Sequence, residues 1–462
     1  MHSVQPVKEQ STRKKPAARV CAPPTVPPGQ VVPGLEKHLL VDGFKLVLDL
    51  EKSHGSTLVD AATGKKFIDF YSFFASMPIG FNHPYFDDPA VQADLLAAAK
   101  VKVANSDVYS VQYATFIDTF ARVMGLPPLE RYFFIDGGSL AVENALKAAM
   151  DWKVRKNLAA GRGERGTEIL HFAGAFHGRS GYTMSLTNTD PRKTDLFAKF
   201  PWPRVSSPFL DFSLPEDERL QNVIEKEKLA EGQIRRFIAE RGQDIAAVII
   251  EPIQCEGGDR HFRREWLQLL RNICDQNDML LIFDEVQAGM GMTGKNWCCQ
   301  HFDVLPDLLA FGKKAQVCGV MAGPRLDEVQ DNVFRLPSRI NSTWGANFCD
   351  FVRSTHFLRI IEKDKLVENA RLQGARLLEE LRLIAKKHPA MSSVRGRGLL
   401  WAFDQPDGAT RDQFWSAAYE LGLFVLRCGD RSIRLRPALD LKDDAIEAAL
   451  ELIESVCKQL AF

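Results

Sequence analysis

Between about Val91 and Gly345 the chain alternates short apolar runs with helical stretches, and this alternation limits its fold more than any other feature. Apolar runs of this length are typical of buried strands. Strands that alternate with helices along a chain indicate a mostly parallel sheet covered by helices on both faces. We therefore predict an α/β fold with sheet strands within residues 131–138, 167–176, 244–253 and 279–285.

The segments on either side of this alternation have a different pattern. Residues 35–90 contain short strand-like runs separated by glycine turns. Beyond Asn347, a long helical stretch to about Leu383 is followed by three strand-like runs and a terminal helix from about Lys442 to Leu460. We predict a large domain over residues 91–345 and a smaller α+β domain over residues 346–462, to which residues 35–90 contribute.

Residues 1–34 differ from the rest of the chain because they hold seven of its 24 prolines. Proline density of this kind prevents regular structure, so we predict a disordered or extended arm. The basic cluster Arg13–Lys15 is not followed by an apolar run, and the arm is therefore not a secretory signal. An organelle-targeting segment is the alternative interpretation.

The overall composition excludes several classes of partner. Lys plus Arg and Asp plus Glu both number 59, so the net charge is zero and favours neither nucleic acid nor an acidic membrane. No apolar run reaches the length of a membrane span. The nine cysteines form no C-x-x-C pair, which indicates reduced thiols and a cytoplasmic location.

Two of the apolar runs end at side chains that suit one kind of chemistry. The run Leu280–Phe283 leads to Asp284, and the run Leu308–Phe311 is followed by a glycine and then Lys313. Open α/β sheets bind ligands at the carboxyl ends of their strands. A lysine can hold an aldehyde as a Schiff base while a carboxylate keeps a pyridine nitrogen protonated, so the pair suits pyridoxal 5'-phosphate (PLP). A solvated lysine and a helix-capping carboxylate are the alternatives, and spacing does not exclude Lys314 in place of Lys313.

A glycine turn between a predicted strand and a predicted helix offers a place for a phosphate. Gly137, Gly138 and Ser139 occupy this turn. Glycines let backbone N–H groups approach an anion, and the positive end of the helix dipole attracts it. The alternative is an ordinary helix start in which Ser139 is the N-cap.

Two further loops carry candidate residues for substrate binding. Phe176 and Arg179 follow one strand, where an aromatic ring could stack and a guanidinium could pair with a carboxylate. Glu256 lies in a glycine-flanked loop after another strand. A core phenylalanine, a surface arginine and a surface acid are the common alternatives.

Two segments nearer the C-terminus contain further candidate hydrogen-bond donors. Arg434 and Arg436 alternate with apolar residues, so both point to one face of a predicted strand, which is either solvated or a carboxylate clamp. Ser342 and Thr343 lie in a loop where their hydroxyls could donate to a phosphate or face solvent.

From about Leu35 to Phe462 the order and spacing of these segments resemble the class III (omega-amino acid) aminotransferases, a family of fold-type I PLP enzymes. The likeness is carried by the motifs FFASMPIGFNHP, DGGSLAVENALKAAMDWK, FHGRSGYTMSLTNTDPRKT, EPIQCEGGDRHF, FDEVQAGMGMTGK and FGKKAQVCGVMAG. The wording GG-x-x-AVENALK departs from the usual phosphate loop of the class and favours the subgroup that acts on the ε-amine of lysine over the ornithine and GABA types. A racemase or aminomutase and a protein without catalytic activity are the rival readings.

This resemblance implies a role for each candidate near the cofactor. Lys313, rather than Lys314, would form the Schiff base, and Asp284 would pair with the pyridinium nitrogen. The remaining cofactor contacts would come from Gln287 at the phenolic oxygen, Gly138 and Ser139 at the phosphate, Phe176 at the ring face and Thr343 at the phosphate of the partner subunit's cofactor in a homodimer.

The resemblance also implies a reaction and its substrate contacts. L-lysine would give its ε-amino group to 2-oxoglutarate in a ping-pong reaction, yielding 2-aminoadipate 6-semialdehyde, which cyclises, and glutamate. Arg179 would bind the α-carboxylate of lysine, and Arg434 that of 2-oxoglutarate. Glu256 would mask Arg434 while lysine is bound, and Arg436 is the alternative to Arg434.

Overall fold

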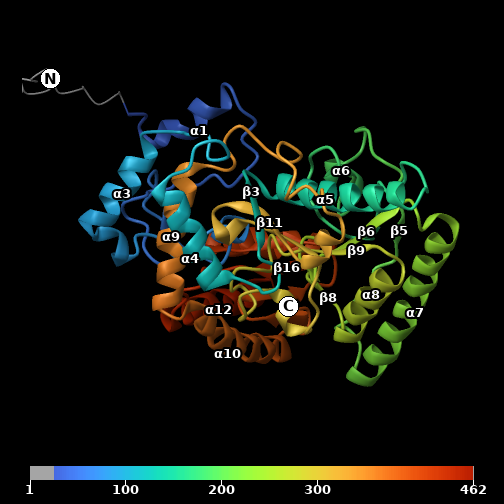
Figure 1. The fold of residues 1–462 in the computed structure, drawn as a ribbon. Coiled ribbons are helices and arrows are strands. Elements are labelled where there is room, and N and C mark those ends of the chain that lie inside the picture. Colours follow the sequence, from blue (N-terminus) through green and yellow to red (C-terminus); the bar gives the residue numbers. More distant parts are fainter. Residues whose placement is uncertain (1–24, 461–462) are drawn as a thin grey trace, which may run out of the picture.

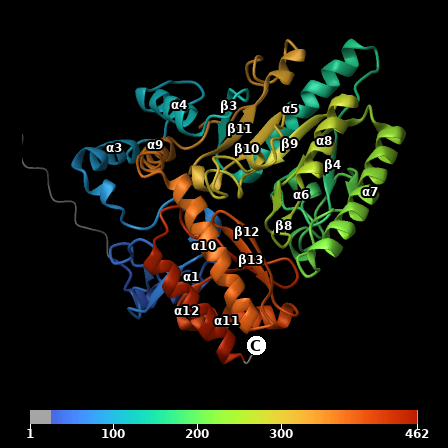
Figure 2. The same ribbon diagram turned by 90° about the horizontal axis from the view of Figure 1, so that it is seen from below.

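A computed structural model of the chain describes residues 25–460, and the predicted proline-rich arm lies outside this range up to residue 24. Its centre is a seven-stranded sheet with helices on both faces (Figures 1 and 2). The strand order is β3 (Arg131–Ile135), β11 (Cys318–Ala322), β10 (Leu308–Phe311), β9 (Leu280–Asp284), β6 (Ile245–Ile250), β4 (Glu168–Phe172) and β5 (Arg204–Val205).

The predicted mostly parallel sheet is confirmed, with one strand in the opposite direction. Strands β10, β9, β6, β4 and β5 pair in parallel, whereas β11 is antiparallel to both of its neighbours, β10 and β3. Only residues 312–317 connect β10 to β11. A connection this short allows an antiparallel neighbour, because a parallel one needs a crossover of a dozen or more residues. The turn that results carries Lys313.

The apolar strands are buried on both faces. Leu280 and Ile282 of β9 belong to one hydrophobic cluster, with α5 (Gly138–Ala159), whereas Leu281 and Phe283 belong to another, with α8 (Arg264–Gln276). Successive side chains of a strand point to opposite faces, so a strand with helices on both sides requires an unbroken apolar run. Helices α4 (Val111–Met124) and α7 (Glu216–Arg241) complete the covering layers.

The remaining strands form smaller sheets. One has the order β1 (Thr57–Val59), β2 (Lys66–Asp69), β14 (Leu423–Phe424), and another β12 (Ser392–Arg397), β13 (Leu400–Asp404), β16 (Ser432–Leu435), β15 (Leu426–Cys428). Strand β2 pairs with β14, so the segment before residue 90 joins the C-terminal part of the chain, next to α11 (Gly408–Leu421) and α12 (Asp443–Gln459). The exact domain boundaries stay a prediction.

Three helices differ from expectation. The proline-rich segment was predicted to lack regular structure, but helix α1 spans Pro28–Glu36. Pro28 is compatible with the start of this helix because the first helical residue needs no hydrogen-bonded N–H. The long helical stretch after residue 347 is two helices, α9 (Phe348–Lys363) and α10 (Leu366–Lys387), separated at Lys365, whose φ is +52°. Within residues 25–460, no helix is long and apolar enough to cross a membrane.

Candidate active site

A cavity of 640 Å³ lies where the parallel strands β4, β6 and β9 end, at the sheet edge where the sequence predicted a ligand site. Loops after these strands and the turn between β10 and β11 form much of its wall. Eight of the predicted site residues line it: Gly138, Ser139, Phe176, Arg179, Glu256, Asp284, Gln287 and Lys313.

Asp284 is buried at the end of β9 and has both carboxylate oxygens satisfied. His177 Nδ1 donates to its Oδ2 at 2.8 Å, and the N–H of Val286 donates to its Oδ1 at 3.1 Å. A buried carboxylate is costly unless it is paired or hydrogen-bonded. Next to it Glu251 accepts the N–H groups of Phe176 and Cys255 at 2.9 and 3.1 Å, and burial raises the pKa of Glu251 to about 7. Two buried acids and one imidazole therefore line the cavity, and the imidazole is hydrogen-bonded to Asp284.

Lys313 lies in the tight turn after β10, with a φ of +50°. Its Nζ donates to the carbonyl oxygen of Phe74 at 3.2 Å. Burial lowers the pKa of Lys313 to about 8, and the positive charge of Arg434 acts in the same direction. A substantial fraction of this amine is therefore neutral near pH 8, as a nucleophile or a base requires.

The structure separates the two adjacent lysines that spacing alone left open. Lys314 is 3% exposed and does not line the cavity. Its Nζ donates to the carbonyl oxygens of Met77 at 2.8 Å and Pro437 at 3.4 Å. Lys314 thus ties two distant segments together, whereas Lys313 faces the cavity.

The N-terminus of α5 opens onto the cavity, as the glycine turn predicted. Gly137 has a φ of +97°, a conformation that favours glycine. A Cβ on Gly138 would lie 2.9 Å from Val286 Cγ1, and a Cβ on Gly178 would lie 2.2 Å from Ser139 Oγ. The glycines therefore allow close packing around the helix end where an anion would sit.

Ser139 is not the N-cap of α5, which was the alternative interpretation. Gly137 occupies the cap position, and no side chain caps the helix. The Ser139 hydroxyl instead shares hydrogen bonds with Ser180 Oγ at 2.5 Å and Thr183 Oγ1 at 2.7 Å. Ser180 itself lines the cavity. These hydroxyls provide donors beside the helix N-terminus.

Two basic side chains hold Glu256. Arg434 Nη2 lies 2.6 Å from its Oε2, and Lys193 Nζ lies 2.6 Å from its Oε1. Burial raises the pKa of Glu256, but the charges of Arg434 and Lys193 outweigh this effect and hold that pKa below its usual value. Arg434 is 1% exposed and also donates to Gln287 Oε1 at 3.1 Å.

The two candidate arginines of β16 have different partners. Arg436 is completely buried, forms an ion pair with buried Asp259 and donates to Gln287 Oε1 at 3.2 Å. Arg434 is the one paired with a glutamate that lines the cavity. Both contact Gln287, so they share a face of the strand as predicted. Their geometry favours Arg434 over Arg436 as the arginine available to a substrate.

The other predicted site residues make fewer contacts with the rest of the chain. Arg179 lines the cavity, is exposed, and has no ion pair or hydrogen bond with any residue in the described part of the chain. The ring of Phe176 lines the cavity with Lys193 Nζ 5.5 Å from its centroid. Thr343 and Ser342 do not line it, and Thr343 is exposed at the surface. Its predicted contact with a partner subunit stays a prediction.

Three residues with strong contacts at this site were absent from the sequence predictions. Glu251 ends the apolar run of β6 in the same way that Asp284 ends β9, and this shared signal could have found it. His177 lies between Phe176 and Arg179, in a loop already chosen. Lys193 has no local signal, because only the fold brings it to Glu256, 63 residues along the chain.

Comparisons with known proteins identify a family. A family model described as aminotransferase class-III matches residues 41–457. The L-lysine-epsilon aminotransferase of Mycobacterium tuberculosis is 50% identical over 431 residues, covering 93% of this chain and 95% of that protein. The protein of the same name from Streptomyces clavuligerus is 49% identical over 424 residues, covering 91% and 92%.

A solved structure agrees over the whole fold. The lysine aminotransferase from M. tuberculosis in the internal aldimine form has a TM-score of 0.92 and 48% identity, and the match covers 94% of this chain and 100% of that one. An ornithine aminotransferase from Toxoplasma gondii has a TM-score of 0.74 and only 22% identity, which supports the fold alone. This chain belongs to the class III aminotransferases, a PLP-dependent family.

Proposed function

We propose that this enzyme transfers the ε-amino group of L-lysine to 2-oxoglutarate, giving 2-aminoadipate 6-semialdehyde and glutamate. One observation carries the proposal: the cavity is lined by one arginine without a partner among the described residues, Arg179, and by Glu256, which pairs at 2.6 Å with the buried Arg434 and so masks it. An open and a masked carboxylate site suit an enzyme that binds an amino acid first and a dicarboxylate second. The 50% identity to proteins named L-lysine-epsilon aminotransferase supports this choice of amine.

The cavity fits PLP in its donors and its shape. The close packing at Gly178 and the hydroxyls at the start of α5 suit the phosphate, and Asp284 with its His177 partner suits a protonated ring nitrogen. When bound, PLP supplies an electron-poor ring that accepts the electron pair left on the substrate carbon. We assign the contacts as follows: Lys313 to the aldehyde, Asp284 to the ring nitrogen, Gln287 to the phenolic oxygen, Phe176 to the ring face, and Gly138 and Ser139 to the phosphate.

Lys313 is the residue that moves the proton in this proposal. Its Nζ would take a proton from the substrate carbon that carries the reacting amine and give it up to the cofactor in the same half-reaction. The second half-reaction would run this transfer in reverse and leave a proton on the carbon of the amine acceptor. A pKa lowered to about 8 matches this task, because a base works best when its pKa is near the working pH. Asp284 remains a hydrogen-bonded acceptor at the ring nitrogen, oriented by His177.

Arg179 and Arg434 distinguish the two substrates. Arg179 pairs with the α-carboxylate of lysine, so the distant ε-amine is the one that reaches Lys313. In the second half-reaction the α-carboxylate of 2-oxoglutarate pairs with Arg434, and Glu256 must leave that arginine. A buried arginine without a carboxylate is costly, so Arg434 stays paired in both steps.

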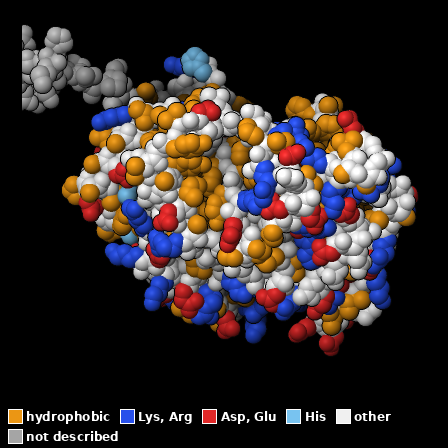
Figure 3. Space-filling model, viewed as in Figure 1, with side chains coloured by type: hydrophobic (Ala, Val, Ile, Leu, Met, Phe, Trp, Pro, Cys, Tyr) orange, Lys and Arg blue, Asp and Glu red, His pale blue; other side chains and the backbone are white. Residues whose placement is uncertain are grey.

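A homodimer is part of the proposal, with Thr343 of the partner subunit completing each phosphate site. Several large apolar side chains are exposed near this residue or in the segment 108–111: Val108, Tyr109, Val111 and Trp344. Figure 3 shows hydrophobic side chains gathered in a band on the face that Figure 1 presents. Exposed apolar patches of this kind mark protein interfaces.

We also propose a cytoplasmic location. All eight cysteines in the described part of the chain are free thiols. Free thiols are expected in a compartment whose redox poise keeps cysteines reduced. Fractionation of the native host cell checks this point.

The test of the proposed activity is a panel of amines with 2-oxoglutarate as acceptor, with glutamate as the readout. L-lysine should be the best donor, and its product should cyclise to a six-membered imine. Ornithine gives a five-membered imine and GABA gives no ring of this kind, so product analysis separates the two alternative activities. A higher kcat/KM for ornithine or GABA than for lysine would refute the assignment.

A further inference from the structure

Glu256 is held by two cations rather than one, and the two contacts use different oxygens. Arg434 binds Oε2 and Lys193 binds Oε1, both at 2.6 Å. The two sites differ in depth: the side chain of Arg434 is 2% exposed, whereas that of Lys193 is 27% exposed. Glu256 therefore bridges a buried cation and one nearer to solvent.

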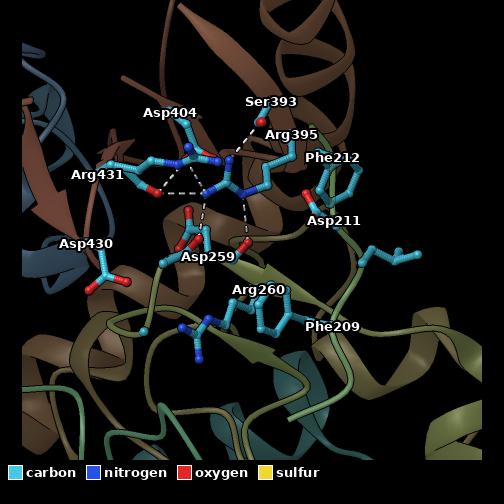
Figure 4. Close-up of a pocket in the computed structure, with 15 residues that line it drawn as sticks. Phe209, Asp211, Phe212, Asp259, Arg260, Ser393, Arg395, Asp404, Asp430 and Arg431 are labelled. Carbon is cyan, nitrogen blue, oxygen red and sulfur yellow. Dashed lines mark hydrogen bonds and ion pairs between the residues drawn. The ribbon is translucent and has the colours of Figure 1, made fainter. Parts of the chain in front are cut away.

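The backbone that carries Glu256 is fixed from the other domain. Arg395 of β12 donates to the carbonyl oxygens of Gly258 at 2.6 Å and Asp259 at 3.0 Å, and it pairs with Asp404 at 2.9 Å (Figure 4). The N–H of Gly429 donates to the carbonyl oxygen of Glu256 at 3.0 Å. A change of partner by Glu256 thus requires rotation of its side chain, while the loop stays in place.

There is room for that rotation on the side of Lys193. A second cavity, of 570 Å³, is lined by both Glu256 and Lys193, and Arg434 is not among its lining residues. Glu256 forms part of the wall between this cavity and the one that holds Lys313. The side chain can turn away from Arg434 without losing contact with Lys193.

We propose that Lys193 is the second partner that makes exchange at Arg434 possible. This inference rests on the proposed function of Glu256 and deepens it. When a dicarboxylate takes Arg434, Glu256 turns toward the second cavity and keeps its ion pair with Lys193. Without Lys193 the displaced carboxylate would lose its remaining ion pair in a largely buried place, which is costly. The arginines that also line the second cavity, Arg192, Arg411 and Arg427, are already paired with Asp190 and Asp412. Lys193 is thus a positioning residue: it acts through Glu256 and favours the half-reaction in which a dicarboxylate binds Arg434.

The test compares Lys193→Met with wild type in the PLP-loaded enzyme. Glutarate serves as an unreactive dicarboxylate probe, hexanoate as a monocarboxylate probe, and both dissociation constants are measured by isothermal titration calorimetry. Lys199→Met is the matched control, because Lys199 is also a lysine, its side chain is 34% exposed, it pairs with Asp195, and it lines neither cavity. Single-turnover rates with lysine and with 2-oxoglutarate are measured alongside.

Loss of Lys193 should weaken glutarate binding by roughly ten- to a hundredfold, the value of one charge-assisted contact. Hexanoate binding and the lysine half-reaction should change by less than about threefold, since neither displaces Glu256 from Arg434. Lys193→Arg should restore glutarate binding. In a Glu256→Gln background, Lys193→Met should have little further effect on glutarate, because no charge is then displaced.

Two results would overturn the role of Lys193. Unchanged glutarate binding in Lys193→Met would show that Lys193 does not assist the exchange at Arg434. Equal weakening of glutarate and hexanoate binding would make Lys193 a general carboxylate contact. These binding measurements do not depend on turnover. If lysine proves a poor donor while the glutarate effect holds, the proposed amine is wrong and the role of Lys193 stands.

Discussion

Replacing Gly178 by alanine tests the phosphate site with a single added methyl group. Gly178 has a φ of +118°, and its Cβ would lie 2.2 Å from Ser139 Oγ. The backbone strain of a non-glycine residue in such a region costs about 1–3 kcal/mol. The serine must also move, and its hydrogen bonds to Ser180 and Thr183 contribute about 1 kcal/mol each.

These terms predict a free energy of unfolding lower by about 3–5 kcal/mol in the variant without PLP. The affinity for PLP should fall by roughly ten- to a hundredfold, because a displaced Ser139 loses a contact to a charged phosphate. Denaturant unfolding measures the first quantity, and titration of the apo-enzyme with PLP, followed by absorbance, measures the second.

Gly181→Ala is the matched control in the same loop. Gly181 has no positive φ, and its added Cβ would lie 3.5 Å from the nearest atom, Glu143 Oε1, which is ordinary contact. It should leave PLP affinity within about twofold of wild type, since surface changes away from special contacts are small. Equal PLP affinities for the Gly178 and Gly181 variants would refute the reasoning that places the phosphate at Ser139.

Three further predictions concern the lysines and the switch residue. Lys313→Ala should abolish turnover while Tm changes little, whereas Lys314→Met should lower Tm, because the Nζ of Lys314 donates to the carbonyl oxygens of Met77 and of buried Pro437. Activity assays and thermal melts separate the two, and the reverse pattern would exchange their roles. The rate at which the apo-enzyme captures PLP should rise with pH and reach a plateau above about pH 8, because the pKa of Lys313 is lowered and only the neutral amine attacks the aldehyde. A rate that still rises toward pH 10.5 in rapid-mixing experiments would contradict this prediction. Glu256→Gln should unmask Arg434 and raise KM for lysine by roughly tenfold, which corresponds to a loss of about 1.4 kcal/mol in discrimination between the two substrates. KM for 2-oxoglutarate should change little. Steady-state kinetics in which KM changes equally for both substrates would argue against masking.

Strands β3, β4, β6 and β9 of the large sheet were predicted because their signal is local, whereas β5 and β11 were not predicted. A strand buried on both faces must be apolar at every position, so β9 and β10 stand out from the chain around them. The end of such a run at the sheet edge also marks Asp284, and a glycine and a lysine after β10 mark Lys313. The reversed direction of β11 follows from the short connection before it, which a closer reading of spacing could have found.

The pairing of distant charges was not predictable. Glu256, Lys193 and Arg434 come from loops and a strand up to 241 residues apart, 193 to 434, and nothing in their local sequence says which acid meets which base. Many salt bridges and candidate pairs exist in a chain with equal numbers of acids and bases, 59 of each. Packing of β16 against the loops that carry Glu256 and Lys193 selects these contacts.

The sequence by itself determined the α/β architecture, the sheet edge that carries the site and the family resemblance, because hydrophobic period and motif spacing are properties of neighbouring residues. The tertiary structure shows that Lys313 rather than Lys314 faces the cavity and that Arg434 rather than Arg436 meets Glu256, two choices that residue spacing left open and the resemblance implied. Only the tertiary structure decided that Lys193 shares this glutamate. The physical reason is that charge pairing and burial depend on distances between segments, which the fold sets and the local sequence does not.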